Sequence, residues 1–437
     1  MKMFAYYLQL GLRSLRRNPV LTALMVLGIA LGIAASMTSL TVFHMMGSDP
    51  IPWKSSKLHY VQMDNWDPNQ PYGDDGSPPD QITYRDAVAL MQAGKADKQT
   101  AMFKLALPIQ PANPQVKPFM ALGRVASADF FGMFEPPFRY GGPWGRDQDA
   151  AHARVLVLTS DTNEKLFGGQ DSVGKTVRMD GVDYSVVGVL DKWKPRFKFY
   201  DLTNGALSAA DEFFMPFTTA IDLRQRASGN NSCWKFPGEG WDAYLQSDCV
   251  WIQMWVQLDS PARLAEYKSF LDSYVNEQKR LGRFPRPLDN RLPNVTQWMQ
   301  AQRVVPRDVE VQTWLGFAFL TVCLVNTIGL LLAKFMRKSG EIGLRRALGA
   351  SRSEVFRQFL IESGVVGLSG GLVGLLLTGL GLIAVRALYA DYKNVAQLDW
   401  TMVLTTLVLA IVAALLAGLY PTWRACRVQP ASQLKTQ

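Results

Sequence analysis

The chain is poor in the residues from which metal and catalytic centres are usually built. Its 437 residues include three histidines and four cysteines. The histidines are far apart, at His44, His59 and His152, and no HExxH, GxSxG or closely paired cysteine motif occurs. These absences exclude the common metal and nucleophile sites, so we expect no bound metal and no enzymatic activity of the chain's own.

Charged residues are also few, at 19%, against 48% hydrophobic residues. The apolar residues gather in four long runs, at about 20–46, 311–334, 359–389 and 400–421. Because about 20 helical residues cross a hydrocarbon layer of about 30 Å, each run is long enough to span a lipid bilayer. None has the polar face of a soluble core helix. The first run is too long for a cleaved signal peptide, so we expect four transmembrane helices.

Basic residues flank these runs on one side. Residues 1–19, the 335–358 segment and the 422–437 tail are all positively charged, within a net charge of +9. The positive-inside rule therefore places both termini and the 335–358 segment in the cytoplasm, and residues 47–310 and 390–399 outside it, which in a bacterium is the periplasm. The positive charge reflects topology, so we expect no nucleic-acid partner. Residues 1–19 form either an amphipathic helix on the membrane surface or an extension of the first span.

Residues 47–310 are numerous enough to fold around a core of their own. Their pattern mixes strands, at 155–158 and 251–258, with helices at 83–93, 160–167 and 262–281. Residues 177–190 predict a hairpin about Asp180–Gly181, and residues 64–80 and 135–145 predict loops. The expected fold is an α-helical membrane protein with a large mixed α+β periplasmic domain inserted between its first and second transmembrane helices.

One motif of this domain imitates a nucleotide site. The segment GQDSVGKT matches the Walker A pattern through Gly169, Gly174, Lys175 and Thr176. A phosphate-binding loop follows a strand and opens a helix, whereas this segment follows a predicted helix and leads into a hairpin. We therefore interpret it as a false positive, and expect no cofactor in this chain.

The cysteines divide by compartment. Cys233 and Cys249 lie in the predicted periplasmic domain, where the oxidising environment favours a disulfide between them. The alternative is two buried thiols. Cys323 lies in a predicted span and Cys426 on the cytoplasmic side, so both are expected to be free.

The segment between the second and third spans predicts two helices. The first covers Glu341–Leu348 and stops at Gly349, and the second follows Ser351, with Glu354 at the capping-box position. A short charged helix of this kind suits docking to a cytoplasmic partner, although a loop that only sets topology would also carry basic charge. In the third span, Gly367, Gly370, Gly371 and Gly374 form two GxxxG pairs, which favour close helix packing.

Four stretches together resemble, in order, the MacB/FtsX family of ABC-transporter permeases, the type VII or mechanotransmission group. They are LGLRSLRRNPVLTALMVLGIALGIA, residues 125–190, RKSGEIGLRRALGASRSEVFRQFLIES and LLAGLYPTWRACRVQPASQLK. The resemblance implies that a coupling element rests on an ABC ATPase dimer that binds ATP and magnesium. Its residues would be Glu341, Ile342, Gly343, Leu344, Arg345, Arg346, Ala347 and Gly349.

The resemblance further implies a second permease, either a copy (a homodimer) or a related chain (a heterodimer). Because no credible P-loop or Walker B strand is present, we expect the ATPase to be a separate polypeptide. The expected function is a permease subunit of the bacterial inner membrane that turns ATP hydrolysis into periplasmic work. Of three possible kinds of work, we favour export with a periplasmic membrane-fusion adaptor and an outer-membrane channel. The alternatives are lipoprotein extraction and signalling to a cell-wall hydrolase.

The predicted spans carry few ionisable residues. Besides His44 they contain Glu362 and Arg386, both near predicted helix ends. A relay that carried ions or solutes through the membrane would need more such groups, so the pattern favours work outside the bilayer.

Overall fold

The computed structural model describes residues 18–427 except 194, 196 and 390–397, together with residues 7, 9 and 13. The chain forms two compact units. Residues 1–48 and 305–437 make up the first, which we call the membrane unit, and residues 49–304 make up the inserted domain. The predicted amphipathic helix within residues 1–19, most of the 390–399 loop and most of the 422–437 tail lie outside the described residues.

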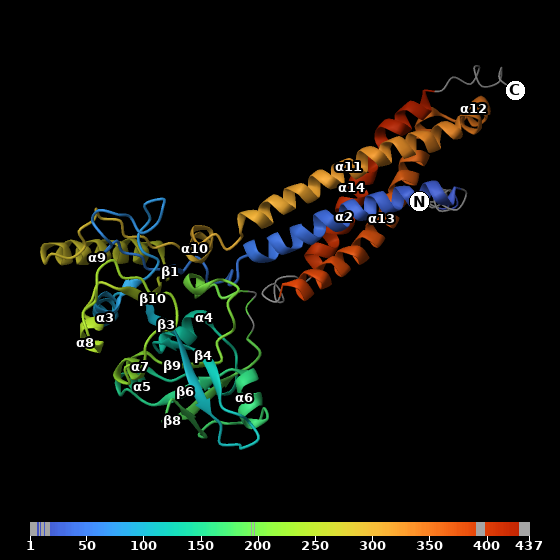
Figure 1. The fold of residues 1–437 in the computed structure, drawn as a ribbon. Helices are drawn as coiled ribbons and strands as arrows, with labels where there is room; N and C mark the ends of the chain where they lie inside the picture. The colour runs from blue at the N-terminus through green and yellow to red at the C-terminus, as the bar shows by residue number, and fades with distance from the viewer. Residues whose placement is uncertain are drawn as a thin grey trace. The chain divides into compact units, whose positions relative to one another are not determined.

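The membrane unit is a bundle of long helices (Figure 1). Four helices of the described chain are long and apolar enough to cross a membrane: α2 (Pro19–Gly47), α11 (Arg307–Arg337), α13 (Arg352–Leu388) and α14 (Trp400–Cys426). A short helix, α12 (Ser339–Ala347), lies between α11 and α13 in the chain. The 335–358 segment, for which the sequence predicts two helices, is mostly helical, since it contains α12, α11 continues to Arg337 and α13 begins at Arg352.

Small residues bring the helices of this bundle together. On α13, Gly367 and Gly371 face α14, where a Cβ at Gly371 would lie 2.6 Å from that of Ala410. Gly370 and Gly374 face α2, where a Cβ at Gly374 would lie 2.8 Å from Cγ2 of Ile33. Both GxxxG pairs thus serve contacts within one chain, because removing the Cβ lets the backbones approach.

The inserted domain is built on a sheet of ten strands. The strand order is β1-β10-β3-β4-β9-β6-β8-β5, with β2 paired to β10 and β7 paired to β3 and β8. The β4–β9 and β6–β8 pairs are parallel, and the other pairs are antiparallel. The strands are β1 (Leu58–Tyr60), β2 (Ile82–Thr83), β3 (Lys98–Gln110), β4 (Phe119–Ala126), β5 (Phe138–Gly141), β6 (Val155–Leu158), β7 (Thr176–Met179), β8 (Val182–Leu190), β9 (Phe213–Pro216) and β10 (Val250–Gln257).

Helices cover both faces of this sheet. Successive strand residues alternate between two cores, so Phe213 joins the core beneath α9 while Phe214 joins the core beneath α4. The first core is also covered by α3, α6 and α7, and the second by α10. The helices are α3 (Tyr84–Ala93), α4 (Asp129–Phe134), α5 (Arg146–Ala150), α6 (Ser160–Phe167), α7 (Phe217–Asp222), α8 (Trp241–Leu245), α9 (Pro261–Arg280) and α10 (Val295–Ala301), with a 3₁₀ turn at Leu202–Asn204.

The strand predicted at 251–258 is β10, and all eight of its residues are buried because both faces of the sheet are covered. One expectation is corrected. The predicted 135–145 loop contains β5, an edge strand that pairs with β8. The hairpin of β7 and β8 forms as predicted, with Asp180 and Gly181 at φ of 48° and 77°, as a type I′ turn requires.

A fully buried ionic network ties the segment after β8 to the sheet. Arg124 of β4 pairs with Asp201 and Asp211, and its Nη1 donates to Oε1 of Gln253 at 2.8 Å. Lys198 pairs with Asp211 at 2.9 Å. Burial alone would raise the pKa of Asp211, but Arg124 and Lys198 outweigh it and hold that pKa below its usual range. Lys198 and Asp201 are thus anchored inside their own domain.

Candidate functional site

The helix α12 is set between two defined ends. α11 stops one residue before it, and Gly349 follows with a φ of 101°, which residues with a side chain rarely adopt. Ser351 then caps α13 reciprocally: its Oγ accepts from the N–H of Glu354, whose Oε2 accepts from the N–H of Ser351 at 2.9 Å. These caps determine where α12 ends and where α13 begins.

One face of α12 is attached to the bundle. Ile342 is 3% exposed and joins a core with Phe335 and Phe359. Arg345 donates from Nη1 to Oε1 of Gln358 on α13 at 2.9 Å. Arg346 donates from Nη1 to the carbonyl oxygen of Cys426, at the end of α14, at 3.3 Å. A force on α12 would therefore reach α13 and α14 directly.

The opposite face of α12 is open. Leu344 of α12 and Leu348, the residue directly after the helix, are 57% and 81% exposed. The two are four residues apart, so they lie on one side of this segment. Glu341 is exposed beside them, with Oε1 accepting from Nη2 of Arg345 at 2.7 Å. Of the predicted coupling residues, Glu341, Leu344, Ala347 and Gly349 are exposed, whereas Ile342 and Gly343 face inward. The prediction omitted Leu348, which its spacing from Leu344 could have indicated.

A buried ion pair links α11 to α13 next to α12. Nζ of Lys334 lies 2.8 Å from Oε1 of Glu362, and both side chains are almost completely buried. Lys338 lies 3.3 Å from the same carboxylate. The sequence placed Glu362 near a helix end and overlooked Lys334, but α13 begins ten residues before Glu362 and α11 continues to Arg337. Both groups therefore lie inside helices.

The Walker-like segment has the geometry of a turn in a β-rich module. It follows α6 and leads into β7, the reverse of the order in a phosphate-binding loop. Its backbone N–H groups are already engaged: that of Gly174 donates to Val186 at 2.8 Å and that of Lys175 to Ser172 at 2.9 Å. Nζ of Lys175 lies over the ring of Phe167, 5.1 Å from its centroid. The two N–H groups therefore bond to carbonyl groups of the protein itself, and the Lys175 ammonium faces an aromatic ring, so the segment does not form a phosphate-binding loop.

The structure joins Cys233 and Cys249 in a disulfide. Among the described residues, the free cysteines are Cys323 and Cys426, and both are buried.

A helical membrane unit with four long apolar helices and a large inserted domain are the features of a multi-pass membrane protein. Residues 22–273 match the family model of the MacB-like periplasmic core domain, and residues 314–430 match that of the FtsX-like permease C-terminal region. The chain belongs to this MacB/FtsX-like family, the permeases of ABC transporters. Its four apolar helices and its periplasmic-type domain make it an inner-membrane protein.

Curated relatives agree with this assignment. The chain is 23% identical to the macrolide export ATP-binding/permease protein MacB of Pasteurella multocida, over 94% of this chain and 55% of that protein. It is 24% identical to MacB of Escherichia coli K12, over 98% of this chain and 60% of that protein. The chain thus spans a little over half the length of these relatives.

Two solved structures resemble part of the chain. The periplasmic region of MacB from Actinobacillus actinomycetemcomitans matches 58% of this chain and 96% of its own, with a TM-score of 0.37 and 15% identity. The extracellular domain of the noncanonical ABC-type transporter YknZ from Gram-positive bacteria matches 48% of this chain and 87% of its own, with a TM-score of 0.31 and 14% identity.

Proposed function

We propose that ABC ATPase domains dock on α12 at the cytoplasmic face and drive work by the inserted domain in the periplasm. The observation that carries this proposal is the two-sided construction of α12. Leu344 and Leu348 form an exposed apolar pair, while Arg345 and Arg346 attach the same helix to α13 and α14. A docking surface needs an exposed apolar anchor, and a lever needs a rigid attachment.

Charge distribution supports the orientation of this arrangement. The basic residues of 1–19, 335–358 and 422–437 all lie at one end of the predicted spans, which the positive-inside rule assigns to the cytoplasm. The ATPase domains bind ATP and Mg²⁺, and their closure displaces α12. The Lys334–Glu362 pair carries the displacement on to α11, the helix that follows the inserted domain in the chain.

The work that this movement performs is export. The names of the relatives, macrolide export ATP-binding/permease proteins, support that assignment. In the proposed assembly two permeases act together with a periplasmic membrane-fusion adaptor and an outer-membrane channel, so that movement of the inserted domain acts on a substrate outside the inner membrane.

Crosslinking from native membranes tests the proposal. The tagged full chain is purified after mild crosslinking, and co-purified ATPase, adaptor and second permease are quantified by mass spectrometry. We expect Glu341→Lys to keep membrane insertion but to uncouple ATP hydrolysis from export. We expect the double variant Leu344→Asp, Leu348→Asp to lower ATPase recovery about tenfold, because it puts two charges on the apolar pair.

Leu281→Asp is the matched control. Leu281 is 70% exposed at the end of α9, in the inserted domain, so the same substitution there should leave ATPase recovery unchanged. Full ATPase recovery with the double variant would show that α12 is not the docking surface. Recovery of the ATPase without an adaptor would support docking of the ATPase on this chain, but it would contradict the proposed export assembly.

A further inference from the structure

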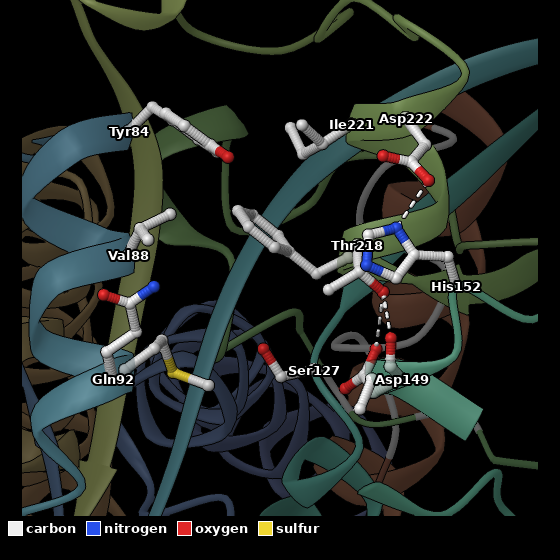
Figure 2. Close-up of a pocket in the computed structure, with 12 residues that line it drawn as sticks. Tyr84, Val88, Gln92, Ser127, Asp149, His152, Thr218, Ile221 and Asp222 are labelled. Atoms are coloured by element: carbon white, nitrogen blue, oxygen red, sulfur yellow. Dashed lines mark hydrogen bonds and ion pairs between the residues drawn. The ribbon is translucent and has the colours of Figure 1, made fainter. Parts of the chain in front are cut away.

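The inserted domain contains a pocket of about 370 Å³ between α3 and α7. That volume lies in the range of small-molecule sites. Figure 2 shows Tyr84, Val88 and Gln92 of α3 along one wall, and Ile221 and Asp222 of α7 with His152 along the other. The α3 residues recur every four positions, so one helix face supplies the wall.

The walls are mainly aromatic and aliphatic. Tyr84 and Phe217 present nearly parallel rings, with centroids 6.2 Å apart and planes at 14°. Val88, Met91 and Ile221 extend this lining. A flat or bulky apolar group is the natural occupant of such walls, and a cation near the ring faces is also stabilised.

The polar lining of the pocket includes two carboxylates. Asp149, Asp222 and His152 line it, and among the described residues no lysine or arginine does. Nδ1 of His152 lies 2.5 Å from Oδ2 of Asp222, so those two groups satisfy each other. The Asp149 carboxylate is the remaining charge, and it reaches the pocket from the end of α5.

The Asp149 carboxylate accepts hydrogen bonds from a backbone N–H and a hydroxyl group. Its Oδ2 accepts from the N–H of Ala128 at 2.7 Å, and its Oδ1 lies 3.5 Å from Oγ1 of Thr218. In the described part of the chain, no lysine or arginine forms an ion pair with it. A carboxylate has about four acceptor positions, so capacity remains for a ligand donor.

Burial raises the pKa of Asp149 to about 6, against the opposing effect of its two donors. At neutral pH the group is therefore an ionised, partly desolvated carboxylate beside an apolar pocket. Such a group is stabilised by a cation that arrives with its own apolar body.

We propose that this pocket binds a small organic cation, a protonated amine on an aromatic or bulky apolar body. The ammonium group pairs with Asp149, and the apolar body lies between Tyr84, Val88 and Phe217. The proposal does not depend on the docking role of α12, since the pocket lies wholly within the inserted domain.

A pair of probes that differ only in charge tests the proposal. The full chain in lipid nanodiscs is dialysed to equilibrium against 1-naphthylmethylamine or neutral 1-naphthalenemethanol, with empty nanodiscs subtracted. We expect the wild type to bind the amine about tenfold more tightly than the alcohol, and Asp149→Asn to remove that preference. Val88→Trp should weaken binding of both probes, because the indole fills the pocket while the charge remains.

Glu277→Gln is the matched charge control. Glu277 is exposed on α9 and does not line the pocket, so its removal should leave both affinities unchanged. The proposal is overturned if the wild type shows no saturable amine binding, or binds both probes equally. It is also overturned if a correctly folded Val88→Trp protein binds as the wild type does, since the probe would then occupy another place. None of these measurements involves the ATPase, so they are independent of the docking experiment.

Discussion

Lys334 of α11 and Glu362 of α13 lie 2.8 Å apart inside the membrane unit, with almost no exposed surface on either side chain. Their contact is an ion pair rather than a well-aligned hydrogen bond, since no group among the described residues meets the ammonium at hydrogen-bond angles. A buried charge is costly unless it is paired, so each residue explains the presence of the other.

Replacing one member of this ion pair should destabilise the folded protein more than replacing both. We expect Glu362→Leu alone to destabilise the protein by about 3–5 kcal/mol, since Lys334 would remain buried and charged. The double variant Lys334→Met, Glu362→Leu should recover most of that loss. Thermal unfolding of the purified proteins in detergent measures the difference. Equal losses for the single and double variants would contradict the pairing.

Glycine at position 367 is required by its neighbour on α14. A Cβ at Gly367 would overlap the side chain of Ala414, whereas a Cβ at Gly379 would have open space around it. We expect Gly367→Ala to cost about 1–3 kcal/mol through overpacking. Gly379→Ala should be neutral or slightly stabilising, because alanine is the better helix former. Unfolding midpoints of the two variants, compared with the wild type, measure this difference. Similar midpoints for both variants would show that the α13–α14 contact is absent.

The disulfide between Cys233 and Cys249 should stabilise the inserted domain. The two residues are 16 positions apart, and closing a loop of that length contributes about 3 kcal/mol by restricting the unfolded chain. Non-reducing peptide mass spectrometry should recover the linked peptides. The variant Cys233→Ser, Cys249→Ser should unfold at a lower temperature. Alkylation of both thiols without prior reduction would show that the bond is not formed in the protein.

The contribution of Asp149 to folding stability should fall as pH rises. Its folded-state pKa of about 6 exceeds the ordinary value of 3.8, so the folded protein binds more protons than the unfolded chain between those values. The contribution of this residue to stability therefore falls as pH rises from about 4 to about 6, and then stays constant. Asn at this position cannot ionise and keeps an acceptor oxygen for the Ala128 N–H.

We therefore expect Asp149→Asn to unfold at a higher temperature than the wild type at pH 7.5, and the advantage to shrink at pH 4.5. Unfolding curves at both pH values measure this difference. Asp129, Asp222 and His152 lie near Asp149 and are the same in both proteins, so the comparison cancels their shared contribution to first order. A difference that does not change with pH would contradict the raised pKa.

Local patterns predicted much of this architecture. Uninterrupted apolar runs identified the four long helices, because a bilayer imposes a minimum length and excludes charge. Turn chemistry identified the hairpin at Asp180–Gly181, and capping residues identified the start of α13 after Ser351. These features depend on residues within a few positions of one another, so they could be predicted without knowing the tertiary structure.

By itself the sequence determined the membrane class, the insertion of a large domain after the first span and the family to which the chain is similar. The tertiary structure alone decided that Lys334 meets Glu362, that Arg124 is buried against Asp201, and that Asp149 opens into an apolar pocket. Each of these relationships joins residues at least 28 positions apart in the chain, or on separate elements. The physical reason is that burial and pairing of charge depend on which elements pack together. The periodicity of a helix or strand shows which of its faces is buried, but it does not show which other element packs against that face.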